Sequence, residues 1–105
     1  MIYEHRTYIS PEGRLSDIVN RFETYTFEIF ERHGIEVVGF WTKKDKSELV
    51  YICQFESEEA MKSAWDSFRG DPEWAIVREK TEANGPIVSK VISEVLVPTH
   101  FSPMK

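Results

Sequence analysis

The sequence predicts an α+β fold of ferredoxin-like β-α-β-β-α-β topology, with a four-stranded antiparallel sheet and two helical regions. Strand-like and helix-like patterns follow one another in that order along the 105 residues. Two central strands, Val37–Trp41 and Leu49–Phe55, are apolar on both faces, which is typical of strands that are buried on both sides. Right-handed crossovers place both helical regions on the same face of the sheet. A second subunit is therefore expected to cover the other face.

Length and composition predict one domain spanning residues 1–105, with an extended tail at residues 98–105. Hydrophobic residues make up 41% of the chain and aromatic residues 13%, which is enough for a packed core. Thirteen basic and eighteen acidic residues give a net charge of −5 with no basic stripe, which disfavours binding to nucleic acid. No apolar run approaches membrane-spanning length and no secretion signal is recognisable, so we expect a cytoplasmic protein without a membrane partner.

The first half of the chain predicts a strand, a long helix and a second strand. The opening strand, Ile2–Ile9, is rich in β-branched and aromatic residues and ends at the turn Ser10–Gly13. Apolar residues at spacings of three and four then predict one continuous helix from Leu15 to His33. Gly34 ends the helix, because glycine readily adopts the left-handed conformation that follows a helix. The second strand is expected from about Ile35 to Thr42.

The second half predicts a strand, an interrupted helix and a last strand. The strand Glu48–Phe55 follows a charged turn, and Ser57 is the expected N-cap of the second helical region. That region breaks at Gly70 and restarts with Asp71 as its cap and Pro72 in its first turn. It stops at the segment Asn84-Gly85-Pro86, and the last strand and the tail are expected at residues 87–97 and 98–105.

Charged residues in the opening strand are the first candidates for chemistry. Glu4, His5 and Arg6 interrupt an otherwise apolar strand, and buried charge needs a partner or a function. In the functional interpretation, His5 is a general base and Arg6 anchors an anionic group of a substrate. In the structural interpretation, Glu4 and Arg6 pair with neighbouring strands or a partner subunit, and His5 forms local hydrogen bonds.

His33 and the aromatic residues are the remaining candidates. His33 could act as an acid or base in a pocket beside Tyr51 or Trp41, or it could cap carbonyl groups at the helix end. Trp41, Tyr51 and Trp65 could form the wall of a cavity for an aromatic ligand, or they could fill the core. The three histidines are scattered, so no metal site is expected, and no cofactor motif is present. The single cysteine, Cys53, is predicted to be a small buried apolar residue rather than a nucleophile.

Several segments in order resemble one known family, NIPSNAP. The resemblance rests on Phe30–Thr42, Glu48–Tyr51, Phe55–Ser57, Asp71–Trp74, Asn84–Pro86 and Pro98–Pro103. It implies a dimeric α+β barrel, in which the sheets of two subunits pack together and the helices lie outside. Proteins that share this barrel include cofactor-free monooxygenases, haem-degrading enzymes and small isomerases, with the ligand commonly between sheet and helices. The family itself implies no settled reaction and no cofactor.

Two functional hypotheses follow from the sequence. In the first, a homodimer binds a small apolar or aromatic molecule in a pocket between the sheet and the helices of each subunit, with cofactor-independent chemistry of a monooxygenase or isomerase type. His5 or His33 would then transfer protons, Arg6 would orient a polar group, and Trp41, Tyr51 and Trp65 would shape the pocket. In the second, the protein is a non-catalytic homodimeric interaction module and the same residues belong to the core.

Overall fold

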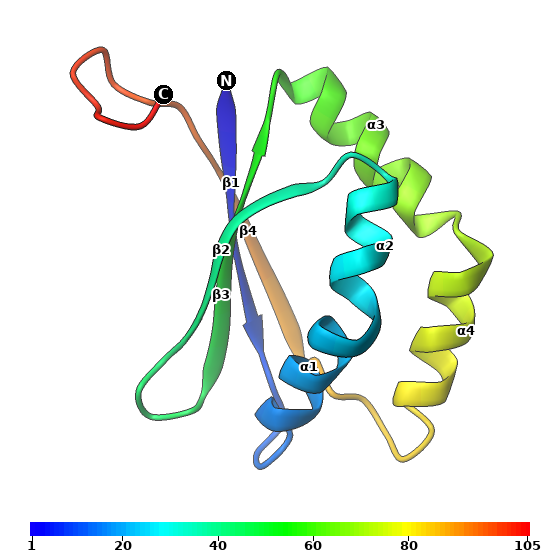
Figure 1. The fold of residues 1–105 in the computed structure, drawn as a ribbon. Coiled ribbons are helices and arrows are strands. Elements are labelled where there is room, and N and C mark those ends of the chain that lie inside the picture. The colour runs from blue at the N-terminus through cyan, green and yellow to red at the C-terminus, as the bar shows by residue number, and fades with distance from the viewer.

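One antiparallel sheet of four strands in the order β2-β3-β1-β4 forms one layer of the molecule, and the helices form the other (Figure 1). The computed structural model describes all residues from 1 to 105. The strands are β1 (Ile2–Ile9), β2 (Glu36–Thr42), β3 (Glu48–Phe55) and β4 (Lys90–Leu96). Each pair of neighbours is antiparallel, and β1 lies between β3 and β4. The predicted ferredoxin-like α+β fold is confirmed.

All helices lie on one face of the sheet, as the right-handed crossovers require (Figure 1). They are α1 (Leu15–Arg21), the π-helical segment η1 (Phe22–Thr26), α2 (Phe27–Arg32), α3 (Glu58–Arg69) and α4 (Pro72–Thr81). Both predicted N-caps are present: the Ser57 hydroxyl accepts a hydrogen bond from the Ala60 amide at 3.1 Å, and the Asp71 carboxylate accepts one from the Glu73 amide at 2.8 Å. No helix combines the length and the apolar content that crossing a bilayer would need.

The first helical region differs from the continuous helix that we predicted. A π-helical turn separates α1 from α2, and the Phe27 amide bonds the Phe22 carbonyl five residues earlier. The Thr26 hydroxyl donates to the Arg21 carbonyl at 3.2 Å. Phe22, Thr26 and Phe30 are all buried. Residues four and eight positions apart share a face of a regular helix as well, so the π-helical turn changes the backbone hydrogen bonding while these three side chains stay buried against the sheet.

The last strand is shorter than the predicted segment 87–97. Ile87 lies in the loop before β4 and is fully buried there, so its apolar character reflects core packing rather than a strand. Both the amide and the hydroxyl of Ser89 donate to the Ile9 carbonyl, at 2.7 and 2.8 Å. Gly34, at φ +74°, ends the first helical region as expected, and the Ile35 amide bonds the Phe30 carbonyl.

The core fills the space between the helices and the helix-facing side of the sheet. Its buried members are Leu15, Ile18, Phe22, Ile29, Phe30, Ile35, Leu49, Tyr51, Cys53, Phe55, Trp65, Phe68, Val77 and Ile87. Burial raises the pKa of the Cys53 thiol to about 12, so the thiol stays protonated at neutral pH. Cys53 therefore behaves as the small apolar residue that the sequence predicted.

No element of the chain covers the opposite side of the sheet, which we call the open face (Figure 1). Because side chains alternate along a strand, the residues between the helix-facing ones point to this side. Several of its apolar side chains are solvent-exposed, including Val38 (38%), Trp41 (52%) and Leu96 (44%). Within a single chain, helices therefore cover one face of the apolar central strands, and the other face stays uncovered.

Candidate functional site

A group of polar side chains lies on the helix-facing side of the central strands, next to the apolar core. We call it the polar cluster; its members are Glu4, Arg6, Tyr8, Tyr51, Trp65 and Ser93. Alternation along β1 places its first three members on the same side of the strand. The strand register then sets Tyr51 of β3 and Ser93 of β4 directly opposite Arg6. The polar cluster is therefore a consequence of the sheet register.

Glu4 is the acceptor at the inner end of the polar cluster. One carboxylate oxygen accepts from the Trp65 indole at 2.6 Å, and the other accepts from Arg6 at 2.9 Å and from the Ser93 hydroxyl at 2.5 Å. The side chain of Glu4 is 4% exposed and that of Arg6 is 11% exposed, so both charges are largely removed from water. These three hydrogen bonds offset the free-energy cost of removing the Glu4 carboxylate from water.

Arg6 connects Glu4 to two tyrosines. Its Nε donates to the Tyr51 hydroxyl at 2.8 Å, and that hydroxyl donates to the Tyr8 hydroxyl at 3.0 Å. The guanidinium carbon lies 4.3 Å from the centre of the Trp65 ring, a cation–π distance. The Tyr8 oxygen accepts in this relay, and its own hydroxyl proton has no acceptor within the chain. The relay therefore ends in a free hydrogen-bond donor.

The electrostatics of the polar cluster favour a charged Arg6 beside neutral phenols. Burial disfavours the Arg6 cation, but Tyr51, Tyr8 and Glu4 outweigh that cost and raise the pKa of the guanidinium. Burial also raises the pKa of Tyr51 well above its ordinary value, with a further contribution from Tyr8. At neutral pH Tyr51 is therefore a neutral donor, and the positive charge of Arg6 polarises its hydroxyl towards Tyr8.

The outer end of the polar cluster opens into a pocket of about 270 Å³, which we call the β4 pocket. It is lined by Tyr8, Arg21, Trp74, Arg78, Glu82, Val88, Ser89, Lys90 and Val91. Val91 and Val95 lie beside Tyr8 and Glu4 in the register, yet both are exposed, because the helices leave the edge strand β4 partly uncovered. The β4 pocket is thus a hollow whose wall combines the aromatic rings of Tyr8 and Trp74 and two valines with charged and polar side chains.

His33 lies in a separate environment, between two polar side chains that the sequence did not connect with it. Its Nδ1 is 2.6 Å from the Ser67 hydroxyl and its Nε2 is 2.6 Å from an Asp71 oxygen. An ionised carboxylate can only accept, so Nε2 of the neutral ring carries the proton and Nδ1 accepts from Ser67. The ring nitrogens therefore bond side chains and not the helix carbonyls of the cap interpretation. His33 and Ser67 also line a pocket of about 580 Å³.

The structure brings together only part of the predicted site. Arg6, Tyr51 and Trp65 are members of the polar cluster, whereas the Phe68 ring lies between Trp65 and His33. The strand register and the alternation of side chains place His5 and Trp41 on the open face, away from the polar cluster. Within the chain, no three acidic, cysteine or histidine side chains come close enough to hold a metal ion.

Four residues of these two sites were not singled out from the sequence: Tyr8, Ser93, Ser67 and Asp71 as a histidine partner. Tyr8 could have been found, because it shares a face of β1 with Glu4 and Arg6. Ser67 and Asp71 lie 34 and 38 positions from His33 along the chain, so only the packing of α3 and α4 against α2 brings them to it.

The contact between His33 and Asp71 predicts a specific pH dependence of stability. The hydrogen bond from His33 lowers the pKa of Asp71, with smaller contributions from two amides at the start of α4 and from Arg32. A lowered folded-state pKa stabilises the fold above the unfolded-state pKa of about 4, and this contribution is lost as the pH falls through the folded-state value. Asparagine can still cap α4, so Asp71→Asn removes the charge and leaves the N-cap. The variant should have a lower urea midpoint than the wild type at pH 7, and the difference should shrink progressively below pH 4.

Asp66→Asn is the matched control for that experiment, because Asp66 is 82% exposed and contacts only Arg69, at 3.7 Å. Its urea midpoint should follow that of the wild type at every pH. If the urea midpoint of Asp71→Asn lies below that of the wild type by the same amount from pH 7 to below pH 4, the His33 contact contributes no charge-dependent stability.

The fold and these two sites define the class of the protein: an α+β protein with a ferredoxin-like sheet, helices on one face of the sheet and a polar cluster between sheet and helices. The family model NIPSNAP matches residues 3–103. The chain therefore belongs to the NIPSNAP family. No curated protein sequence matches the chain.

Similar solved structures agree with this assignment. A NIPSNAP family protein of unknown function from Agrobacterium tumefaciens is 24% identical, with a TM-score of 0.87 over 100% of this chain and 94% of that chain. An uncharacterised NIPSNAP domain protein from Burkholderia xenovorans is 20% identical, with a TM-score of 0.84 over 98% and 99% of the two chains. A Streptomyces coelicolor monooxygenase in complex with the ligand Nanaomycin D is 18% identical, with a TM-score of 0.67 over 93% and 87%. At these identities the likeness shows the fold alone.

Proposed function

We propose that the protein binds a small aromatic or largely apolar molecule with an oxygen acceptor in the β4 pocket. The observation that carries this proposal is the relay from Arg6 through Tyr51 to Tyr8, because it ends in a hydroxyl proton without an acceptor in the chain. Tyr8 would donate that proton to a carbonyl or hydroxyl oxygen of the ligand. Trp74 and Val91 would contact the apolar part of the ligand.

The same relay supports cofactor-independent chemistry on the bound molecule, of a monooxygenase or isomerase type. A ligand that gives up a proton to solvent water develops negative charge on its oxygen, and a donor polarised by a buried cation stabilises that charge. Arg6 would act through Tyr51, and Trp65 would hold Arg6 in place by its ring and by its bond to Glu4. The Streptomyces monooxygenase is a precedent for ligand binding on this fold.

His5 and His33 lie outside the β4 pocket, so proton transfer by either would need a second position of the ligand. For His33 that position would be the pocket it shares with Ser67, where Nδ1 is oriented as an acceptor by the bond from Nε2 to Asp71. For His5 it would be the open face, where Trp41 would also contact a ligand or a partner subunit. The Nδ1 of His5 is buried without a hydrogen-bond partner.

A homodimer formed through the open face is the second part of the proposal. Val38 and Trp41 on β2 and Leu96 on β4 are exposed apolar side chains at the two edges of this uncovered face, and exposed apolar surface favours an interface. Packing against a second copy would bury these side chains in a symmetric interface. The tail residues Val97 and Phe101, both 75% exposed, extend beyond β4 and are available to contact that copy.

The alternative function is that of a non-catalytic homodimeric interaction module. In its favour, Glu4, Arg6 and Tyr51 satisfy one another within the chain and the large aromatic residues fill the core. In that case the polar cluster would serve stability, and the Tyr8 hydroxyl would face only water.

Native mass spectrometry of freshly purified protein, followed by denaturing release, distinguishes the two functions. We expect a dimer that carries a small molecule, together with saturable quenching of tryptophan fluorescence by naphthol. Tyr8→Phe removes the donor to the ligand together with the acceptor of the Tyr51 hydroxyl, and it should weaken naphthol binding about tenfold. Tyr25→Phe, which removes a hydroxyl elsewhere, is the matched control. An empty dimer with equal naphthol binding by the Tyr8 and Tyr25 variants would favour the interaction module.

The dimer itself is tested by a charge on the open face. Val38→Lys should shift the protein to monomers in sedimentation experiments, because burying an unpaired ammonium in the interface is costly. Its folding should be retained, since Val38 is partly exposed within one chain. Lys44→Gln, in the exposed turn before β3, is the control. A wild-type monomer, or a Val38→Lys variant that stays dimeric, would contradict the proposed interface.

A further inference from the structure

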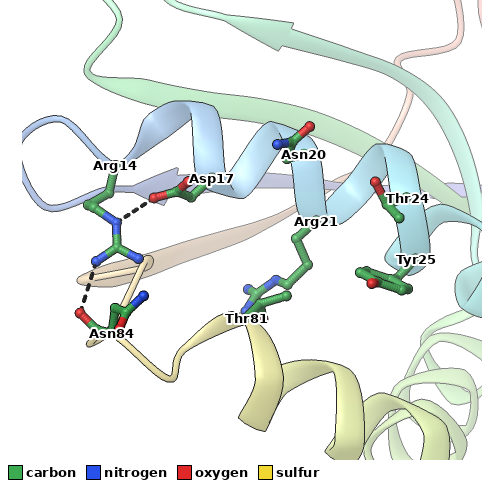
Figure 2. A pocket seen from close by; sticks show the side chains of 8 residues that line it. All are labelled: Arg14, Asp17, Asn20, Arg21, Thr24, Tyr25, Thr81 and Asn84. Carbon is green, nitrogen blue, oxygen red and sulfur yellow. Dashed lines mark hydrogen bonds and ion pairs between the residues drawn. The ribbon is translucent and has the colours of Figure 1, made fainter.

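A second polar pocket lies between the first helical region and α4, away from the polar cluster (Figure 2). It has a volume of about 580 Å³, and we call it the α1–α4 pocket. Its lining residues are Arg14, Asp17, Asn20, Arg21, Thr24, Tyr25, Thr81 and Asn84. Only one of them is an aromatic or aliphatic residue, so the α1–α4 pocket suits a polar ligand.

Arg21 forms the inner wall of the α1–α4 pocket and is incompletely neutralised. Figure 2 shows its side chain extending from α1 towards Thr81. The side chain is 5% exposed, and its Nη1 makes two long hydrogen bonds of 3.3 Å, to Thr81 and to Glu82. Its buried Nε has no acceptor. Burial lowers the pKa of Arg21 despite the opposing effect of Glu82, which marks a cation short of negative charge.

The carboxylates near Arg21 are already engaged by other cations. Glu82 also accepts from Arg78 at 3.2 Å, so one carboxylate serves two guanidinium groups. Asp17 is paired with Arg14 at 2.5 Å. Lys80 contributes a further positive charge, with its Nζ 3.1 Å from the Tyr25 hydroxyl. Among the residues that line the pocket, two cations, Arg14 and Arg21, therefore face one carboxylate, that of Asp17, in a protein whose net charge is −5.

The π-helical turn supplies the rest of the pocket wall. Thr24 and Tyr25 belong to η1, and they line the pocket together with Asn20 from α1 and Asn84 from the loop after α4. These hydroxyl and amide groups can donate hydrogen bonds to an oxyanion. π-Helical turns are rare, and those that occur often lie at functional sites, so the irregularity of the first helical region agrees with a binding role for this pocket.

From these observations we infer that the α1–α4 pocket binds a small oxyanion, with a carboxylate or a phosphate group held between Arg14 and Arg21. Guanidinium groups bind both kinds of oxyanion through paired hydrogen bonds. Arg14 lies at the rim, where its Nη1 reaches the Asn84 carbonyl at 3.4 Å, a contact that an anion would replace. The bound charge would complete the neutralisation that Glu82 provides only in part.

Isothermal titration calorimetry of the purified protein with inorganic phosphate and, separately, with succinate tests this inference. We expect one site per chain for at least one of the two anions. Heat with phosphate alone indicates a phosphate-bearing ligand, heat with succinate alone indicates a carboxylate, and heat with both indicates a site that accepts either. No saturable heat with either anion at millimolar concentration would overturn the inference.

Two variants assign any binding to the α1–α4 pocket. Arg14→Gln and Arg21→Lys should each weaken binding about tenfold, because each removes part of the guanidinium donor set. Arg69→Gln, in α3 and 63% exposed, is the matched control and should bind as the wild type does. Equal losses in Arg14→Gln and Arg69→Gln would show nonspecific attraction to positive charge and would contradict the site. Arg14 does not line the β4 pocket. If Arg14→Gln does not weaken anion binding, the proposed naphthol binding in the β4 pocket is therefore unaffected.

Discussion

Replacing Glu4 by leucine is expected to lower the free energy of unfolding by about 3–5 kcal/mol. The substitution leaves the Arg6 guanidinium buried beside Trp65 without its carboxylate, and it removes the acceptor of the Trp65 indole and of the Ser93 hydroxyl. Urea denaturation followed by circular dichroism measures the change. This is one of the two largest effects that we expect from a single substitution in the chain.

A double variant separates the unpaired charge from the loss of packing. Glu4→Leu combined with Arg6→Met removes both charges and should recover part of the stability that Glu4→Leu alone loses, because no unpaired ion remains. Glu48→Leu is a matched control, since Glu48 pairs with Lys43 at the start of β3. A Glu4→Leu loss no larger than that of Glu48→Leu would mean that the ion pair of the polar cluster contributes little to folding.

Replacing Phe30 by alanine is expected to cost about 3–5 kcal/mol of folding stability. Phe30 is 1% exposed, and its ring centre lies 5.0 Å from that of Phe68, 5.4 Å from that of Trp65 and 5.7 Å from that of Phe22. Removing the ring leaves a cavity at the point where α2, α3 and the π-helical turn meet. Urea midpoints and slopes measure the loss.

Phe101→Ala tests whether that effect depends on burial, because Phe101 lies in the tail and is largely exposed. Its unfolding free energy in the monomer should change by less than about 0.5 kcal/mol. Phe30→Leu should fall between the two, since leucine fills part of the cavity. If Phe30→Ala and Phe101→Ala had the same effect, the aromatic core would not be the main source of stability.

Local rules along the chain were sufficient to predict the order of the elements. Ser57 and Asp71 are N-caps because their side chains accept from free amides of the first turn, which depends only on residues a few positions away. Gly34 ends a helix for an equally local reason. The single-sheet topology then follows from the right-handed crossover rule.

Two elements were predicted wrongly because the local pattern fits more than one structure. The π-helical turn is not visible in the spacing of apolar residues, since Phe22 and Phe30 would share a face in a regular helix as well. Ile87 is apolar because it fills the core from a loop, and an apolar residue next to a strand pattern is indistinguishable from a strand residue in sequence.

The sequence by itself determined which face of β1 carries Glu4, Arg6 and Tyr8, because alternation along a strand is a local property. Only the tertiary structure decided that these residues meet Tyr51, Trp65 and Ser93, and that His33 meets Ser67 and Asp71. Hydrogen bonds act over about 3 Å, whereas the partners are separated by 34 to 89 positions of chain. Strand register and helix packing bring such partners together, and both depend on the whole core.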